Sequence, residues 1–159
     1  IFPLADAPHH YWTGYFTSRP ALKRQVRFAS NLLNAARQME TISGVSKTEV
    51  GLATTRPSPP VGNGWTDSLE GTIGIATHHD GMSGTERQDV ADDYELRIAE
   101  SQVEVEEGIV KSLSKLMGSD SGNTNIATHN FSHCSCAQMN SCLNISMCAF
   151  TADSKDGFS

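Results

Sequence analysis

Three consecutive residues with metal-binding or hydrogen-bonding side chains, His78, His79 and Asp80, lie between two segments that favour helices. An imidazole can ligate zinc, and the groups beside it can orient that ligand or bind a substrate. Because adjacent side chains usually diverge, we expect one imidazole to ligate a metal while its two neighbours line the same pocket. Gly81 and Gly84 allow the backbone to approach a ligand closely or to adopt a positive φ.

The residues after this triplet carry the pattern of a helix start. Ser83 and Glu86 have the spacing of a capping box, in which each side chain binds the backbone amide of the other. The amides of 84–86, and the dipole of the helix that they begin, would then point toward the pocket. A plainer interpretation remains open, in which the two histidines are surface residues and Asp80 only stabilises a turn.

The elements that must position the triplet are helices. Apolar residues recur at helical spacing over about 19–42, 67–77 and 83–118, which predicts one core-facing stripe on each of three helices. The stripe residues are Leu22, Val26, Ala29, Leu33 and Ala36, then Leu69, Ile73 and Ala76, then Val90, Tyr94, Ile98, Val105, Ile109, Leu113 and Leu116. Candidate N-caps are Ser18 for the first helix and Thr66 or Asp67 for the second, and candidate stops are Gly44 and Gly118. The predicted fold class is mainly α, with a three-helix bundle.

The segments outside these helices have different patterns. Residues 1–16 are rich in aromatic residues, Pro and His, and they look like a strand end followed by an active-site-type loop. Residues 51–64 contain three Pro and three Gly and are predicted to form a loop. A polar linker over 119–124 marks a boundary, and the alternation that starts near 142 predicts a β-strand. The chain begins at Ile1 without Met, so we expect a fragment or a proteolytic piece of a longer polypeptide.

The charge and hydropathy patterns argue against two kinds of partner. The net charge is −6 and the acidic residues concentrate between Glu86 and Glu107, which is unlike a nucleic-acid-binding surface. No apolar run reaches the length of a membrane span. We therefore expect no nucleic-acid partner and no membrane span. The basic residues nearest to one another follow a helical pattern and are predicted to form a solvated face: Arg19, Lys23, Arg24 and Arg27.

The last quarter of the chain has features of the secretory route. It contains all four cysteines and two glycosylation acceptors: Cys134, Cys136, Cys142 and Cys148, with Asn130 and Asn144. An even set of close cysteines beside two acceptors favours disulfides in an oxidising compartment. The alternative is a zinc knuckle of His133 with the first three cysteines, although Cys-x-Cys spacing is less usual in such sites than Cys-x2-Cys.

The triplet is also part of a longer motif. His-His-Asp-Gly-Met-Ser-Gly-Thr at 78–85 resembles the signature of glycoside hydrolase family 38, the class II α-mannosidases. Three further segments of this chain resemble segments of the same family, in the same order and at about the same spacing. They are Phe-Pro at 2–3 with Ala-Asp at 5–6, Tyr-Trp-Thr-Gly-Tyr-Phe-Thr-Ser-Arg-Pro-Ala-Leu-Lys-Arg at 11–24, and Val-Ala-Asp-Asp-Tyr at 90–94. Leu-Asn-Ile-Ser at 143–146 resembles the segment where a β domain begins. The whole is most similar to the lysosomal or vacuolar branch.

The resemblance implies a zinc-dependent retaining exo-α-mannosidase that removes terminal α-D-mannose from glycoproteins and oligosaccharides. It assigns zinc ligation to His79, contacts with substrate hydroxyls to Asp80, a place lining the pocket to His78, and an aromatic wall against the sugar to Trp12. Trp12 by itself would be predicted as a half-buried core aromatic. In such an enzyme zinc coordinates two adjacent sugar hydroxyls, while one carboxylate attacks the anomeric carbon and a second carboxylic acid protonates the leaving oxygen.

Other parts of the family's site match nothing in this sequence. The nucleophile, the acid/base residue and the further zinc ligands have no counterpart, so no catalytic residue is assigned here and the chain alone is expected to be inactive. The expected partners are α-mannoside glycans and the remaining segments of the same polypeptide. The resemblance implies that 1–17 end an α/β catalytic domain, that 18–118 form the helical middle domain, and that 119–159 are a linker and the first strands of a β-sandwich domain.

The resemblance also bears on location and on the cysteines. The expected location is the lysosome or vacuole, or outside the cell after secretion. The family pairs a cysteine before the Leu-Asn-Ile-Ser segment with the one after it, and either Cys136 or Cys142 could be this partner of Cys148. Two alternatives remain: a non-catalytic carbohydrate-binding or structural helical module, and an unrelated helical protein with a metal-binding tail.

Overall fold

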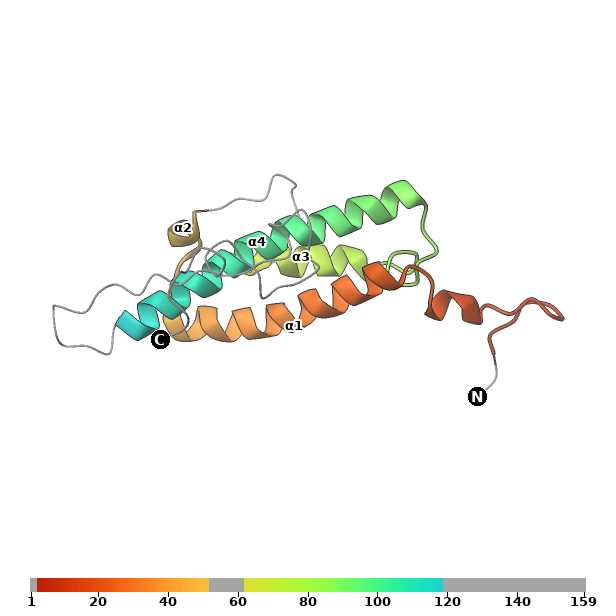
Figure 1. Ribbon diagram of the computed structural model, residues 1–159, viewed down its shortest axis with the longest axis horizontal. Helices are drawn as coiled ribbons and strands as arrows, with labels where there is room; N and C mark the ends of the chain where they lie inside the picture. The colour runs from red at the N-terminus through yellow and green to blue at the C-terminus, as the bar shows by residue number, and fades with distance from the viewer. Residues whose placement is uncertain (1–2, 52–61, 119–159) are drawn as a thin grey trace, which may run out of the picture.

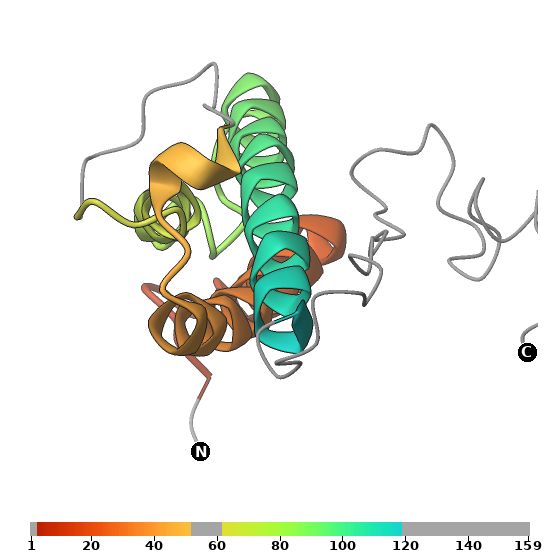
Figure 2. The ribbon, with the colours of Figure 1, turned by 90° about the vertical axis from the view of Figure 1, so that its left-hand side faces the viewer.

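The protein is mainly helical over the part of the chain that its computed structural model describes, residues 3–51 and 62–118. The elements are the 3-10 helix η1 (Thr13–Phe16), α1 (Pro20–Ser43), α2 (Lys47–Val50), α3 (Asp67–Ala76) and α4 (Gln88–Gly118). α1 and α4 run in the same direction and α3 returns between them, while the single turn of α2 packs against α4 (Figures 1 and 2). The predicted three-helix bundle is confirmed.

β structure is sparse in the described residues. It is limited there to one antiparallel bridge between Ala5 and Tyr11, in the segment that projects from the bundle before η1 (Figure 1). The predicted strand near 142, the cysteines and both glycosylation acceptors lie outside the described residues. None of the helices in the described part combines the length and the apolar character that crossing a membrane requires.

α1 has the predicted extent but not the predicted N-cap. It ends at Gly44, whose left-handed φ of 61° lets its amide bind the carbonyl of Glu40, as expected for a glycine stop. At the other end, the Ser18 hydroxyl donates to the carbonyl of Gly84 (2.8 Å) and caps no α1 amide. The cap position is held by Arg19 instead. The Ser18 prediction was wrong because folding brings a distant carbonyl within reach of the hydroxyl.

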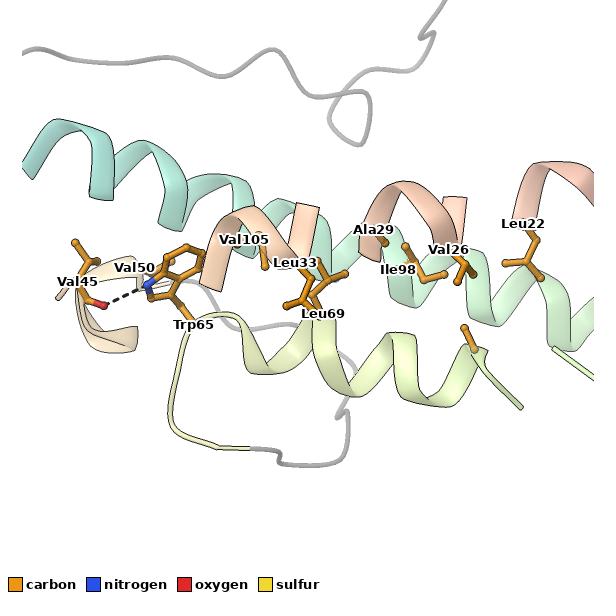
Figure 3. Close-up of a cluster of buried hydrophobic side chains, with 12 residues drawn as sticks. Leu22, Val26, Ala29, Leu33, Val45, Val50, Trp65, Leu69, Ile98 and Val105 are labelled. Carbon is orange, nitrogen blue, oxygen red and sulfur yellow. Dashed lines mark hydrogen bonds between the residues drawn. The ribbon is translucent and has the colours of Figure 1, made fainter. Parts of the chain in front are cut away.

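The core is a single row of side chains along the bundle axis (Figure 3). The whole predicted stripe of α1 is buried, with Leu69 and Ala76 of α3 and Ile98 and Val105 of α4. Of the other residues predicted for these stripes, Ile73, Tyr94 and Ile109 pack against this core while partly exposed. Burying these apolar faces against one another supplies most of the driving force for the bundle.

Trp65 is the largest residue of the core, and the sequence pattern did not single it out. It lies in the turn before α3 and is fully buried. Its indole Nε1 donates to the carbonyl of Val45 (3.2 Å), as the dashed line in Figure 3 shows. The six-membered ring covers Gly108 of α4, where a Cβ atom would lie 2.3 Å from Cε3. A glycine at 108 is therefore what allows the tryptophan to fill this end of the core.

The start of α3 is stabilised from another helix. Thr66 occupies the predicted N-cap position but makes no side-chain cap, and the Asp67 carboxylate accepts from the amide of Gly64 (2.8 Å). Glu40 of α1 instead accepts from the amide of Trp65 through Oε1 (2.7 Å) and from the Thr66 hydroxyl through Oε2 (2.8 Å). A carboxylate at a helix N-terminus is favourable for both its hydrogen bonds and its charge.

This contact leads to a stability prediction. Glu40→Gln should lower the free energy of unfolding by about 1–2 kcal/mol, because one of two oxygen acceptors becomes an amide donor and the charge is lost. Urea unfolding followed by circular dichroism measures it. The matched control is Glu107→Gln, which loses only the half-exposed partner of Lys111 (3.6 Å) and should change stability by under about 0.5 kcal/mol. Equal effects of the two substitutions would contradict the role given to Glu40.

Candidate functional site

The triplet lies in a chain of tight turns between α3 and α4, at the end of the bundle where α1 begins (Figure 1). The amide of His78 donates to the carbonyl of Ile75 (3.0 Å), and that of Gly81 donates to the carbonyl of His78 (2.9 Å). These successive turns curl the backbone, and the three side chains gather instead of diverging. Their candidate ligand atoms all lie within 4.8 Å of one another, which corrects the expectation of divergence.

The geometry of this cluster suits a metal ion. Nε2 of His79 and Nε2 of His78 lie 3.4 Å and 3.6 Å from Oδ2 of Asp80. Ligand atoms about 2.1 Å from a tetrahedral zinc ion are about 3.4 Å apart, so the donor types and both spacings fit zinc. The His79 side chain is 83% exposed, which leaves the outer side of the cluster open to further ligands. Among the described residues, it is the one group of at least three metal-binding side chains that come this close.

Asp80 is the centre of the hydrogen bonds in the loop. Its Oδ1 accepts from the Thr85 hydroxyl (2.8 Å). Its backbone carbonyl accepts from the amides of Thr85 and Glu86, both at 3.1 Å. The orientation of this carboxylate is therefore fixed by the loop, while Oδ2 faces the two imidazoles.

The capping box predicted at 83–86 is wrong. α4 begins at Gln88, and the Ser83 hydroxyl donates to the carbonyl of His79. The amides expected to face a ligand are occupied by carbonyls of the loop: that of Gly84 donates to Gly81, and those of Thr85 and Glu86 donate to Asp80. A helix cap and a turn compete for the same short polar side chains, and here the turn dominates.

The two glycines of the loop serve packing inside the protein. A Cβ at Gly81 would lie 2.8 Å from the carbonyl oxygen of Ala76 and 2.9 Å from the Tyr94 ring. Gly84 has the expected positive φ, 73°, and a Cβ there would lie 2.7 Å from the carbonyl oxygen of Ser18. Glycine lets the loop sit closely against its neighbours at both positions, and the positive φ expected of such a residue is found at Gly84.

Two open pockets flank Tyr15 at this end of the bundle. The pocket beside the triplet has a volume of about 360 Å³ and is lined by Tyr15, Phe16, Lys23, Thr77, His78, His79, Met82 and Ser83. The second has about 420 Å³ and is lined by Tyr11, Trp12, Gly14, Tyr15, Ser18 and Thr85. The structure therefore places Trp12 in a neighbouring pocket and not in the one that His78 and His79 line.

Trp12 is exposed and lies outside the hydrophobic core of the described residues. Its side chain is 53% exposed, contrary to the half-buried core position expected for an isolated tryptophan. Its Nε1 donates to Oδ1 of Asp6 (3.1 Å), which holds the indole by its edge and leaves ring surface accessible. An exposed indole face is a suitable stacking surface for the apolar side of a sugar ring.

Two of the basic residues predicted to form a solvated face instead hold the loop. Arg19 contacts Glu86 and Gln88, and Lys23 donates to the carbonyls of Ser18 and Ser83. Apart from Ser18, their partners lie 60 to 69 residues further along the chain, so periodicity within α1 could not reveal these contacts. Thr85 and Tyr15 were likewise missed as parts of the site.

A comparison with protein families connects this geometry to known proteins. Residues 10–116, from just before Trp12 through most of α4, match the family model described as the alpha mannosidase middle domain. The chain belongs to this family. The middle-domain match includes the triplet, both pockets and the whole helical core.

Curated relatives of this middle domain have the same family name. The chain is 44% identical to an alpha-mannosidase of Arabidopsis thaliana over 76% of its length, covering 10% of that protein. It is 40% identical to the lysosomal alpha-mannosidase of Homo sapiens over 74% of its length, covering 11% of it, and 38% identical to that of Felis catus over 87%, covering 13%. The chain thus spans about a tenth of the length of these relatives. No solved structure gives a significant match.

Proposed function

We propose that this middle domain is part of a zinc-dependent, retaining exo-α-mannosidase that removes terminal α-D-mannose residues from glycans. The observation that carries the proposal is the cluster of two imidazoles and a carboxylate around Oδ2 of Asp80, in a chain of this family. Relatives named alpha-mannosidase support the substrate class. The lysosomal relatives support a lysosomal or vacuolar location, with secretion as the alternative.

The contacts of the individual residues support the roles that we propose for them. His79 holds zinc, since its side chain is the most exposed of the cluster. Asp80 binds mannose hydroxyls: the Thr85 hydroxyl holds its Oδ1, and its Oδ2 lies beside the two imidazoles that line the pocket. His78 lines the same pocket, and Trp12 offers an aromatic wall on the other side of Tyr15. When bound, zinc supplies a Lewis acid that orients adjacent sugar hydroxyls.

The chemical steps belong to other parts of the polypeptide. Retaining hydrolysis requires a carboxylate nucleophile and a carboxylic acid that later acts as a base. We assign neither to this chain, which orients the sugar and contributes to the metal site. Catalytic zinc usually has three protein ligands, so we expect at least two further ligands from the remaining segments of the same polypeptide.

Metal removal tests this proposal in the complete polypeptide. A chelator should abolish hydrolysis of an aryl α-mannoside, because the Lewis acid that orients adjacent sugar hydroxyls is lost, and added zinc should restore it. Zinc content and turnover are measured in the same samples. Turnover that survives complete removal of zinc would contradict the metal role, and zinc binding without any hydrolysis would favour a non-catalytic carbohydrate-binding module.

A further inference from the structure

The start of α1 and the loop before α4 are joined by polar contacts directly beside the triplet. The Arg19 guanidinium donates through Nη2 to the carbonyl of Glu86 (2.8 Å) and through Nη1 to Oε1 of Gln88 (2.6 Å). The Ser18 hydroxyl donates to the carbonyl of Gly84 (2.8 Å). The loop has no regular secondary structure between α3 and α4, so these contacts are a main determinant of its position.

The centre of this set is a buried ion pair. The Glu86 side chain is only 2% exposed, and its Oε1 lies 3.1 Å from Nε of Arg19. Within the described part of the chain, no hydrogen bond reaches either oxygen of this carboxylate, and Arg19 is the cation that faces it. A carboxylate removed from water is strongly destabilising without such a partner.

The backbone of Arg19 is also unusual. Its φ of 47° and ψ of 61° place it in the left-handed region, which residues other than glycine rarely adopt. Such a conformation persists where surrounding contacts hold it in place, and these positions concentrate at functional sites. Here the three contacts of the guanidinium are the forces that hold it.

The ion pair is joined to the triplet by a backbone hydrogen bond between Glu86 and Asp80. The amide of Glu86 donates to the carbonyl of Asp80 (3.1 Å), as does the amide of Thr85 (3.1 Å). The Thr85 hydroxyl binds the Asp80 carboxylate itself (2.8 Å). A shift of Glu86 would therefore move both the backbone and the side chain of Asp80, and with them the adjacent His79.

We propose that Arg19 and Glu86 are positioning residues, whose buried ion pair sets the direction in which His79 and Asp80 face the metal and the sugar. The inference rests on the proposed function for its catalytic consequence. Its structural part, that the pair orders the loop, stands on the contacts alone. Arg19 and Glu86 touch neither metal nor sugar in this assignment and act only through Asp80 and His79.

The experiment compares three variants of the complete polypeptide with a control. Arg19→Gln leaves a buried carboxylate without its cation, and Glu86→Gln removes that carboxylate. The double variant replaces both charges by neutral amides. The control, Arg87→Ala, removes the neighbouring arginine, whose side chain is 82% exposed and pairs with Asp89 on the surface. Arg19→Lys, which keeps the charge, replaces Arg19→Gln if that variant does not fold.

The first readout is hydrogen exchange of the Thr85 and Glu86 amides, which needs no activity. Arg19→Gln should accelerate it by about tenfold or more, while exchange within α1 and α4 remains unchanged. The second readout is zinc affinity and kcat/KM for an aryl α-mannoside, both expected to fall by about 10–100-fold. The double variant should recover part of this loss, and the control should stay within about twofold of wild type.

Each result decides a separate question. Unchanged hydrogen exchange at Thr85 and Glu86 in Arg19→Gln would overturn the inference. Faster exchange would also overturn it if zinc affinity and kcat/KM stayed within about twofold of wild type. A wild-type polypeptide without zinc-dependent hydrolysis would overturn the proposed function instead. The exchange data would then still show whether the ion pair orders the loop.

Discussion

Replacing His79 by alanine should abolish hydrolysis of an aryl α-mannoside by the complete enzyme and weaken its retention of zinc. The His79 side chain is the most exposed of the metal-binding cluster, and its Nε2 lies 3.4 Å from the carboxylate that we assign to the sugar. Loss of a group that only orients a metal ligand typically costs about 10–100-fold in affinity or activity, so loss of the ligand itself should cost more. Turnover and zinc content after dialysis measure the two effects.

Asp80→Asn is the matched control for this prediction. It keeps the shape of the side chain and can still accept from the Thr85 hydroxyl, so zinc should remain bound while turnover falls. Near wild-type activity in His79→Ala would show that the assignment of the ligand is wrong. Loss of zinc in Asp80→Asn would instead show that Asp80 is itself a ligand, which its distances of 3.4 and 3.6 Å to the two imidazoles allow.

Gly108→Ala should destabilise the bundle by about 2 kcal/mol or more, although alanine favours a helix interior over glycine by about 1 kcal/mol. The new Cβ would lie 2.3 Å from Cε3 and 2.5 Å from Cδ2 of Trp65, far inside the contact distance of two carbon atoms. The indole is fully buried and held through Nε1 by Val45, so it has little room to move. Urea unfolding of the chain measures the change.

Gly74→Ala tests the same substitution where there is space. Gly74 lies inside α3, and among the described residues no atom beyond its chain neighbours and the backbone of its own helix comes within 4 Å of a Cβ built there. The substitution should therefore raise the free energy of unfolding by about 0.5–1 kcal/mol. A stabilising effect at both positions would show that Trp65 does not depend on Gly108. In a Trp65→Leu background, Gly108→Ala should cost less, since the two residues are in direct contact.

The sequence by itself determined the helices and the family. Apolar residues at helical spacing predicted α1, α3 and α4, because a chain must bury such stripes to fold. Gly44 ended α1 as expected, since glycine is the residue that best adopts the left-handed conformation. The ordered motifs at 11–24 and 78–85 indicated the α-mannosidase family, and the match over 10–116 confirmed it. All of these features depend on the spacing of residue types along the chain, and a single sequence shows that spacing completely.

Only the tertiary structure decided which partner each polar side chain has. Ser18, Ser83 and Thr66 all looked like helix caps, and each binds another group instead. A short hydroxyl side chain bonds whichever carbonyl, carboxylate or amide folding brings nearest, and local sequence does not show which one that is. The contact of Arg19 with Glu86 spans 67 positions, and that of Glu40 with Trp65 spans 25.

The same reason explains why the sequence did not predict the geometry of the triplet. Its residue types marked it as a candidate site, but whether three neighbouring side chains diverge or converge depends on the backbone between them. The turns after α3 bring the ligand atoms of His78, His79 and Asp80 within 4.8 Å of one another. Those turns are held by contacts with the start of α1, which exist only once the helices have packed.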